Sequence, residues 1–258
     1  MPLPFLKKVL PARTRLALRM LYWRARGIFY AGQAVYCPLC ETSFRQFLPF
    51  GKPLRAQAMC PKCNTVERHR LLWFYLQEQV QINTRAFKVL HMAPEPILQQ
   101  KLKKLPNLDY LSADLESAVA MQHVDLQDLP FATASFDLIL CSHVLGHVPD
   151  DRKALRELRR VLRPHGLLLL QDHVSESLPH TEEFPASLTA QERSALYGQP
   201  DRCRNYGQDF QDLVKAQDFD LETLDYTPAL PAEQLQRLGL KYRERLFLGR
   251  PRPARHAE

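Results

Sequence analysis

Four of the six cysteines form two C-x-x-C pairs, Cys37-Pro-Leu-Cys40 and Cys60-Pro-Lys-Cys63, with 19 residues between them. Each pair predicts a tight turn that directs two thiolates toward one point, and the proline stiffens the turn. Two such turns at this spacing indicate a tetrahedral zinc site. Because four protein ligands leave no coordination position for a catalytic water, we expect the zinc to be structural.

Two other interpretations of these cysteines are weaker. Four unrelated buried thiols would not fall into two equal pairs, and a redox C-x-x-C would lie in a βαβ pattern, which neither pair does. Cys141 and Cys203 stand outside the set, and Cys141 falls in an apolar run that predicts burial. The basic residues expected to offset the charge of a four-thiolate centre are Arg45, Arg55, Lys62 and Arg68.

From residue 87 onward, short apolar runs alternate with helical periods, which is typical of a parallel sheet with crossover helices. The predicted strands are 87–91, 108–113, 122–124, 136–141, 167–171, 220–225 and 243–248. The predicted helices begin near 94–95 and 150–151, with two more near 207–217 and 231–238, and Pro164-His165-Gly166 ends the second. This order predicts a doubly wound, seven-stranded, mostly parallel α/β sheet, in which ligands bind at the carboxyl ends of the strands.

The most specific stretch of the chain is residues 124–170, VDLQDLPFATASFDLILCSHVLGHVPDDRKALRELRRVLRPHGLLLL. It resembles the central block of class I S-adenosylmethionine-dependent methyltransferases, which carry an acidic residue, LPF, SFD, a VLEH segment and an RVLKPGG turn. The four-cysteine head, ERHR at 67–70, the VLHMAPEP turn and YGQPDRCRNYG resemble a bacterial subgroup of these enzymes that bears a zinc ribbon. The resemblance implies a Rossmann-like methyltransferase domain over residues 84–250.

The resemblance also assigns cofactor contacts at two strand ends. Asp114, after the second strand, would accept hydrogen bonds from the ribose hydroxyls, and Asp125, after the third, would accept one from the adenine amino group. Leu126 would pack against the adenine ring. Asp114 could instead be a solvated turn residue, in which case Glu116 would accept the ribose hydroxyls. Asp125 could instead cap a helix or a turn.

The turn after the first strand departs from the family pattern, because residues 91–95 contain no glycine. Ala93 is small enough for a close approach of the backbone, and Glu95 either receives the methionine amino group or complements the helix dipole. His91 and Cys141, at the ends of the first and fourth strands, are further candidate cofactor contacts.

Histidine at strand ends could act as a general base for a hydroxyl acceptor. His143 and His173, after the fourth and fifth strands, are the candidates, whereas His147 matches a family histidine that we expect to be structural. The segment 197–206 then supplies candidate acceptor contacts, because arginines can clamp a carboxylate or phosphate. These candidates are Arg202, Arg204 and Tyr206, and a solvated loop with ordinary ion pairs is the alternative.

Charge is distributed unevenly along the 258 residues. Residues 1–36 carry seven basic and no acidic side chains, which equals the net charge of +7, and residues 241–258 carry six basic and two acidic ones. Leu10, Leu16, Met20 and Trp23 share one face of the N-terminal segment. That segment could lie on an anionic membrane, bind RNA phosphates or pack on its own domain.

Apolar residues make up 45% and charged residues 24% of the chain, which excludes disordered, collagen-like and disulfide-miniprotein classes. No apolar run approaches the roughly 18 residues of a membrane span, and arginines interrupt the N-terminal apolar stretches before a signal-peptide core can form. We therefore expect a cytoplasmic protein without a transmembrane segment.

The sequence predicts four regions: a basic amphipathic segment (1–36), a zinc-ribbon-like head with a connecting helix (37–80), a methyltransferase domain (84–250) and a basic tail (251–258). The predicted activity is methyl transfer from S-adenosylmethionine to a small or conjugated metabolite, such as a glycan or a lipid-linked compound. An RNA methyltransferase that grips phosphates with its head and basic ends is the first alternative. A non-catalytic scaffold built on a degenerate methyltransferase fold is the second.

Overall fold

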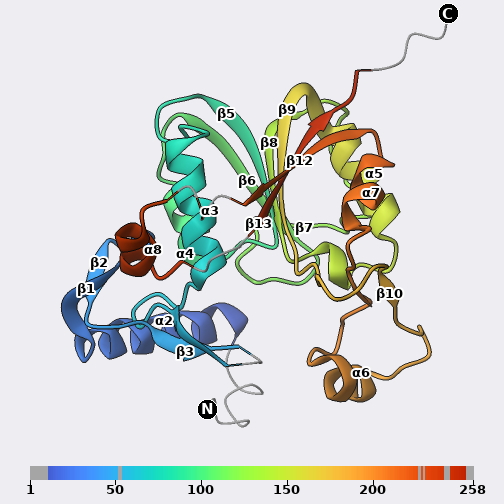
Figure 1. Cartoon of the computed structure of the whole chain (residues 1–258). Coiled ribbons are helices and arrows are strands. Elements are labelled where there is room, and N and C mark those ends of the chain that lie inside the picture. The colour runs from blue at the N-terminus through green and yellow to red at the C-terminus, as the bar shows by residue number, and fades with distance from the viewer. Residues whose placement is uncertain (1–10, 52–53, 226–227, 229, 241–244, 254–258) are drawn as a thin grey trace, which may run out of the picture. The chain divides into compact units, whose positions relative to one another are not determined.

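The computed structural model describes residues 11–51, 54–225, 228, 230–240 and 245–253. A helix and two hairpins come first, and strands then alternate with helices (Figure 1). These elements form two compact units. The first holds residues 1–84, 95–104 and 225–244, and the second holds 85–94, 105–224 and 245–258. The four regions predicted from the sequence stay a prediction.

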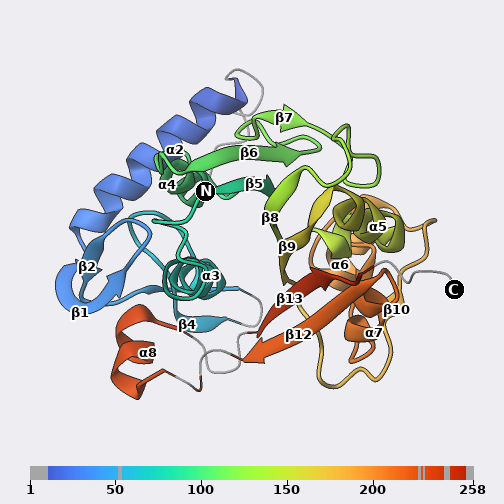
Figure 2. The ribbon, with the colours of Figure 1, turned by 90° about the horizontal axis from the view of Figure 1, so that it is seen from above.

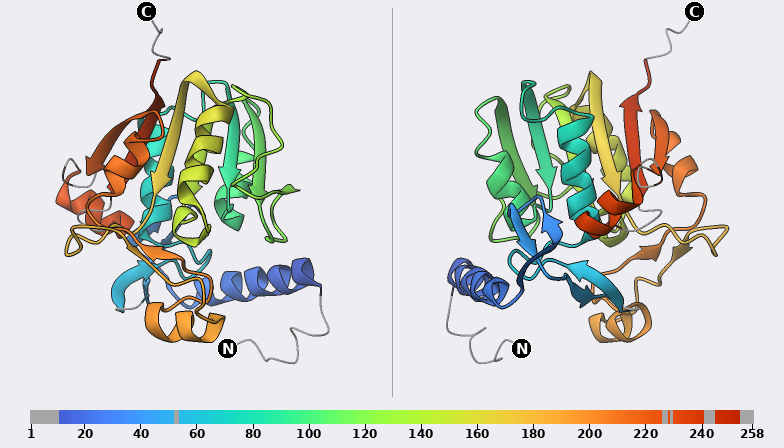
Figure 3. Two further views of the ribbon diagram at one scale, coloured as in Figure 1. Left: turned by 90° about the vertical axis from the view of Figure 1, so that its right-hand side faces the viewer. Right: turned by 60° about the vertical axis from the view of Figure 1, so that its left-hand side comes forward.

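In the described part of the first unit, helix α2 (Ala12–Ile28) precedes two antiparallel hairpins (Figure 3). The hairpin strands are β1 (Ala31–Cys37) with β2 (Thr42–Phe44), and β3 (Leu48–Phe50) with β4 (Arg55–Met59). One C-x-x-C closes the first hairpin and the other directly follows β4. The unit is completed by α3 (Glu67–Glu78), α4 (Pro96–Leu102) and α8 (Ala232–Leu238). Leu16, Met20 and Trp23 form a half-buried face of α2, while Leu10 lies outside the described residues.

Arg70 on α3 joins segments of the first unit that are far apart in sequence. Its fully buried guanidinium donates hydrogen bonds to the carbonyl oxygens of Ala58, Thr65, Leu238 and Gly239, at 2.6–3.1 Å. A buried charge is tolerated only when it is fully hydrogen-bonded, so this set fixes the end of α8 against the head. Gly239 has φ +58°, and a Cβ there would lie 2.5 Å from the Phe47 ring, so only glycine fits.

The second unit is built on a seven-stranded sheet in the order β12-β13-β9-β8-β5-β6-β7 (Figure 2). The strands are β5 (Phe87–Met92), β6 (Leu108–Asp114), β7 (Gln122–His123), β8 (Phe136–Ser142), β9 (Leu162–Gln171), β12 (Phe219–Asp225) and β13 (Arg245–Pro251). Strands β5 to β9 pair in parallel, and β13 pairs antiparallel with β9. The strand order reverses between β5 and β8, which makes their carboxyl ends the switch point where ligands bind in such sheets.

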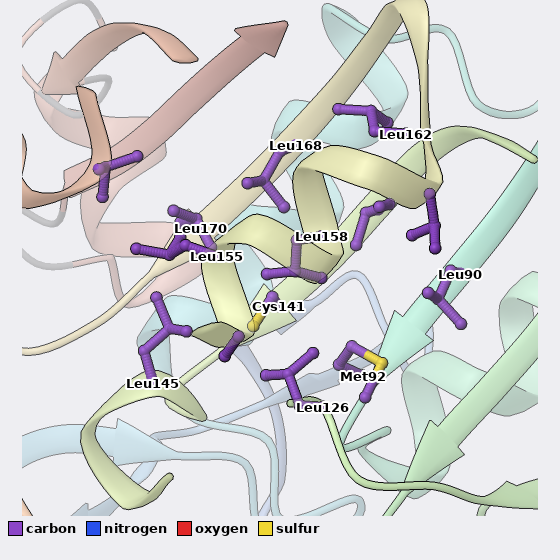
Figure 4. Packing of buried hydrophobic residues seen from close by; sticks show 14 of the residues in the cluster. Leu90, Met92, Leu126, Cys141, Leu145, Leu155, Leu158, Leu162, Leu168 and Leu170 are labelled. Carbon is purple, nitrogen blue, oxygen red and sulfur yellow. The ribbon is translucent and has the colours of Figure 1, made fainter. Parts of the chain in front are cut away.

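Helix α5 (Asp151–Val161) covers one face of this sheet. Its N-cap Asp150 accepts the backbone N–H of Lys153 at 2.8 Å, which satisfies one free donor of the first turn. Its buried face, Ala154, Leu155, Leu158 and Val161, packs in one cluster with residues of the neighbouring strands (Figure 4). Helix α7 (Phe210–Lys215) adds Phe210 and Val214 to that cluster.

The predicted strands and the observed ones agree closely at the start of the sheet and differ at the fifth strand. β9 begins at Leu162, where the sequence predicted residue 167, because pairing with β8 shifts from Phe136–Leu162 to Leu138–Leu167. Pro164 cannot continue a helix and disfavours helical backbone at the residue before it, so α5 already ends at Val161. The last predicted strand included residues 243–244, which lie outside the described residues.

A segment without a core of its own runs from residue 172 to residue 209. It holds β10 (Glu182–Glu183), which pairs with β11 (Arg204–Asn205), and helix α6 (Ala190–Tyr197). Sequence reasoning missed α6, although Thr189 and Glu192 form the capping box that signals a helix start. Within the described residues, no helix is long and apolar enough to cross a membrane.

Candidate functional site

The four paired cysteines converge in the first unit. The Sγ atoms of Cys37 and Cys63 lie 3.6 Å apart, those of Cys40 and Cys60 lie 3.7 Å apart, and all four lie within 4.8 Å of one another. A tetrahedral zinc with sulfur bonds of about 2.3 Å places its ligands about 3.8 Å apart. The cluster therefore fits one zinc ion.

The backbone adopts the same conformation directly after each of the two C-x-x-C pairs. Glu41 and Asn64 each directly follow the second cysteine of a pair, and both adopt left-handed backbone, with φ 51° and 64°. Left-handed residues turn the chain back toward the cysteines, as a metal-binding knuckle requires. Thr65 then places its Oγ1 3.0 Å from the Cys63 Sγ and 3.5 Å from the Cys37 Sγ, so one hydroxyl can support both sulfurs.

The basic residues expected near the cysteines have other partners. Arg55 pairs with Glu67 at 2.7 Å, Arg45 lies over the Tyr30 ring, and Lys62 donates to the Thr42 hydroxyl. The buried cation beside this cluster is Arg70, which sequence reasoning missed. Its position inside ERHR was the available signal, but only the fold shows that the side chain points inward.

The second unit contains a cavity of about 670 Å³ at the carboxyl ends of its parallel strands. Cavities of this size hold small molecules and cofactors. The lining residues are Met92 and Ala93 after β5; Asp114, Leu115 and Glu116 after β6; Val124 to Gln127 after β7; His143, Val144 and His147 to Pro149 after β8; and Gln199 and Asp201. The switch point predicted from the strand order is therefore hollow.

Two of these strands end in the same way. Ala93 and His143, the first residues after β5 and β8, have φ 48° and 55°. The Ala93 N–H donates to the Ala113 carbonyl at 2.9 Å and the His143 N–H donates to the Gln171 carbonyl at 2.7 Å, so each turn stays attached to the neighbouring strand. Left-handed backbone costs energy in residues other than glycine and is concentrated at functional sites. These turns let a loop without glycine change direction at the edge of the cavity.

The predicted cofactor acids line the cavity. Asp114 accepts the backbone N–H groups of Glu116 and Ser117 through Oδ1, at 2.8 and 2.6 Å, and so forms the turn after β6. Among the described residues, its Oδ2 makes no hydrogen bond. Asp125 accepts the Gln127 N–H at 2.8 Å, and buried Leu126 contributes to the apolar floor. Both acids therefore cap turns and keep acceptor capacity at the cavity.

Other predicted cofactor contacts lie elsewhere. His91 is fully buried and bonds through Nδ1 to the Tyr110 hydroxyl at 2.8 Å. Cys141 is packed in the apolar cluster, where burial raises the pKa of its thiol (Figure 4). The Glu95 carboxylate lies 3.2 Å from the His69 Nε2 inside the first unit. For all three, a role at the cofactor stays a prediction.

The histidine candidates separate in the structure. His143 lines the cavity, and its Nδ1 lies 3.9 Å from Oδ1 of Asp172. His173 is exposed, and its backbone N–H donates to the same carboxylate at 2.8 Å. Burial raises the pKa of Asp172, although the His173 N–H bond and the charge of Arg202 act against that shift. Sequence reasoning named the histidines and missed the acid between them.

The acceptor-side candidates hold the segment 172–209 in place. Arg204 is buried and donates to the carbonyls of Leu145, Val148 and Pro149 at 2.7–2.8 Å, and to the Glu183 carboxylate at 3.0 Å. Fully buried Tyr206 donates to Asp151 at 2.9 Å, and Arg202 donates to the Arg204 carbonyl. These bonds bring Gln199 and Asp201 of the same segment to the cavity. Acceptor binding by the three candidates stays a prediction.

The acidic lining of the cavity fits S-adenosylmethionine. Its four carboxylates are Asp114, Glu116, Asp125 and Asp201, and no lysine or arginine is among the lining residues. Such a lining favours a ligand with positive charge and several hydroxyl and amino donors. A sulfonium nucleoside has both properties.

Comparison with known proteins identifies the central part of the chain. Residues 84–170 match the family model described as a methyltransferase domain. An uncharacterized methyltransferase, YcgJ of Bacillus subtilis, is 42% identical over 66 residues, which is 26% of each chain. The 27-O-demethylrifamycin SV methyltransferase of Amycolatopsis mediterranei is 40% identical over 60 residues, 23% of this chain and 22% of that one. The alignments thus span about a quarter of these curated relatives.

Solved structures are similar to this chain at low sequence identity. The structure of YcgJ from Bacillus subtilis has a TM-score of 0.46 at 19% identity and covers 68% of this chain and 97% of its own. The 1,6-didemethyltoxoflavin-N1-methyltransferase of Burkholderia thailandensis, solved with S-adenosylhomocysteine, has a TM-score of 0.47 at 16% identity, covering 72% and 79%.

The sheet order, the cavity at the strand ends and the family match agree with one another. Residues 84–170 match a methyltransferase domain, and the same chain carries a four-cysteine head.

Proposed function

We propose that this protein transfers a methyl group from S-adenosylmethionine to a small or conjugated metabolite. The observation that carries the proposal is the acidic cavity at the switch point of the sheet, which is lined by carboxylates from the ends of β6 and β7. When bound, the cofactor supplies an electrophilic methyl group on a sulfonium. The protein then has to hold two reactants in line and exclude water, which can itself supply a large part of the rate enhancement.

Each cofactor contact has a defined task in this proposal. Asp114 accepts hydrogen bonds from the ribose hydroxyls, and Glu116, two residues later, is the alternative acceptor. Asp125 accepts the adenine amino group, and Leu126 packs against the ring. The Ala93 turn brings the backbone close to the cofactor in place of the usual glycine-rich loop. Roles for His91, Glu95 and Cys141 at the cofactor rest on the family resemblance.

His143 is the general base of the proposal where the acceptor is a hydroxyl. It lies on the cavity wall, and the nearby Asp172 carboxylate can orient its ring and stabilise its protonated form. Asp172 is a positioning residue, because it acts through the histidine. His173 is the second candidate base. Arg202, Arg204 and Tyr206 remain candidate contacts to the acceptor, and the segment that carries them covers the acceptor side.

A small acceptor fits the size of the cavity, and several relatives act on small molecules by name. They include the rifamycin enzyme described above, ajmaline N-methyltransferase of Rauvolfia serpentina and the human thiol S-methyltransferase TMT1B. RNA methylation and a scaffold role are the alternatives. We further propose a cytoplasmic location and a structural role for zinc, held by Cys37, Cys40, Cys60 and Cys63.

Calorimetric titration of the zinc-loaded protein with S-adenosylmethionine and S-adenosylhomocysteine tests the proposal. We expect micromolar binding of both. Because Asp114 accepts two ribose hydroxyls, Asp114→Ala should weaken binding at least about tenfold. The matched control is Asp109→Ala, which removes an exposed carboxylate from the other end of β6 and should leave affinity unchanged.

Folded, zinc-loaded protein that binds neither compound would favour the scaffold alternative. Binding of the cofactor together with RNA binding that falls steeply with salt would favour the RNA alternative over a small acceptor.

A further inference from the structure

Helix α2 presents a second apolar face that its own unit does not cover. This apolar strip consists of Leu18, Leu21, Tyr22, Ile28 and Phe29, whose exposed fractions run from 51% to 76%. The spacing places the four helical residues on one side of α2, and Phe29 directly follows its last residue. They make up five of the ten exposed large hydrophobic side chains of the described residues, so the strip is a concentrated feature and not scattered exposure.

The opposite face of α2 accounts for how the helix is attached. Leu16, Met20 and Trp23 are half-buried, and a Cβ at buried Gly27 would lie 2.8 Å from the Lys62 Cβ. Arg26 donates through Nε to the Pro61 carbonyl at 2.8 Å and through Nη2 to the Asn64 Oδ1 at 2.7 Å. The helix is thus anchored on the second cysteine turn. The side chains of the apolar strip stay exposed beside this attachment, with the Tyr22 ring under the Arg26 guanidinium at 5.8 Å.

Basic side chains flank the apolar strip on both sides. Arg13 and Arg24 lie along one flank of the helix, and Arg15, Arg19 and Arg26 lie along the other. The helix has no acidic residue, and neither has the rest of residues 1–36. An apolar strip between two basic flanks is the pattern of a helix that lies in the interface of an anionic bilayer.

We propose that α2 is a membrane-interface helix that docks this protein on anionic phospholipid. The strip enters the headgroup and acyl boundary, and the arginines other than Arg26 contact lipid phosphates while their stems extend the apolar surface. RNA accounts for the arginines but leaves the aliphatic side chains Leu18, Leu21 and Ile28 in water. A second copy of the chain accounts for the strip but brings two arginine-rich helices together.

The proposal says where the enzyme works and is independent of which acceptor it methylates. An anchored unit keeps the methyltransferase domain near the bilayer surface, where lipid-linked or membrane-partitioned acceptors are concentrated. Because binding depends on apolar contact and charge together, we expect it to require anionic lipid and to weaken as salt increases.

Vesicle co-sedimentation of the full, zinc-loaded chain tests the proposal. Vesicles of phosphatidylcholine mixed equally with phosphatidylglycerol should bind the protein, whereas pure phosphatidylcholine should bind it at least about tenfold more weakly. Leu18→Gln with Leu21→Gln keeps helix propensity and should lower binding about tenfold or more. Arg13→Glu with Arg24→Glu should lower it at least about twentyfold.

Two control variants match these changes away from α2. Leu196→Gln removes an equally exposed leucine from α6, and Lys103→Glu with Arg152→Glu reverses two exposed basic residues. Both should bind vesicles like the unchanged protein. Circular dichroism and zinc content show that each variant is folded, and unchanged affinity for S-adenosylmethionine separates this test from that of the methyltransferase activity.

Equal binding to both vesicle types, or equal loss in the control variants, overturns the proposal. So does binding of RNA without binding of vesicles. A dimer in sedimentation velocity that the leucine variant dissociates, with no vesicle binding, assigns the strip to a second copy instead.

Discussion

The Nδ1 atom of His143 lies 3.9 Å from the Oδ1 atom of Asp172, at the joined ends of β8 and β9. The His143 N–H donates to the carbonyl of Gln171, and the Ser142 hydroxyl donates to the side-chain oxygen of that same glutamine at 3.2 Å. The ends of the two strands are therefore tied together beside the cavity. An acid and a histidine face each other there without a direct hydrogen bond, so a small movement on acceptor binding could close the pair.

Asp172→Asn should stabilise the protein at neutral pH. Burial raises the pKa of Asp172 above its ordinary value of 3.8, so the folded state favours the neutral acid. The neutral Asp172 side chain contributes its full stabilisation below the pKa that this residue has in the unfolded chain. The contribution is lost as pH rises through its pKa in the folded protein. The amide keeps the acceptor for the His173 N–H and removes the buried charge. Urea unfolding should show a gain at pH 7 that shrinks as pH approaches 4.

Asp209→Asn is the control of opposite sign. Burial alone would raise the pKa of Asp209, but hydrogen bonds from the Thr181 N–H and hydroxyl lower it below the ordinary value. Its stabilisation is present above the unfolded pKa and is lost in acid, so Asp209→Asn should destabilise at pH 7 and much less at low pH. Parallel profiles for both variants would contradict the assigned burial of Asp172.

His69 should make the first unit sensitive to acid. Burial lowers its pKa to about 4, and its ring fits the neutral form, in which Nδ1 accepts the Val66 N–H at 3.2 Å and Nε2–H donates to Glu95. The contribution is complete above pH 6.5 and is lost as pH falls toward 4, by about 3 kcal/mol. His69→Asn keeps the Nδ1-like acceptor and does not titrate. Urea unfolding of this variant should therefore depend less on pH across that range, and an unchanged profile would count against a buried neutral histidine.

Zinc removal should unfold the head. Because each cysteine is one of four ligands, Cys63→Ser should lose the metal and lower the thermal midpoint, and a strong chelator should do the same to the unchanged protein. Cys203→Ser is the matched change outside the cluster and should keep about one zinc per chain. Metal analysis by mass spectrometry measures the zinc content of both variants. Full zinc content in Cys63→Ser would exclude the four-thiolate site.

Arg204→Lys should destabilise the segment 172–209 although it preserves the charge. One ammonium cannot reach the three carbonyls and the carboxylate that the guanidinium bonds, so buried acceptors are left unpaired. We expect a loss of about 3 kcal/mol in the free energy of unfolding. Arg156→Lys, at an exposed position on α5, should change it by less than about 0.5 kcal/mol. If both variants changed the free energy of unfolding by the same small amount, Arg204 would not be the residue that holds the segment 172–209 in place.

The parallel strands could be predicted because their signals are local. Strands β5 and β8 are mostly apolar and buried, as is typical of strands in a parallel sheet, and Pro94 shortly after β5 and His143 directly after β8 mark their ends. Helix α6 was missed, although its capping box is also local, because none of its side chains is buried and it has no apolar face. The start of β9 was missed because pairing with Phe136 extends the strand, and pairing is not visible in one segment.

The candidate site also contains residues that could be predicted from the sequence and residues that could not. The family resemblance pointed to Asp114 and Asp125, and His143 was chosen as a histidine at a strand end. All three line the cavity, since parallel strands bring their carboxyl ends to one edge. Strand direction alone does not say to which face a side chain points. The His91 side chain therefore points into the protein, where it contacts the Tyr110 hydroxyl. For the same reason the sequence did not predict that Asp172 lies beside His143.

By itself the sequence predicted the convergence of the four paired cysteines and the strand ends that line the cavity, because spacing and apolar periodicity are properties of neighbouring residues. The tertiary structure decided which cations are buried and which faces stay open. Arg70 and Arg204 look like ordinary surface arginines until distant carbonyls surround them. The apolar strip of α2 is distinguished from its buried face only once the rest of the first unit covers one side and leaves the other exposed.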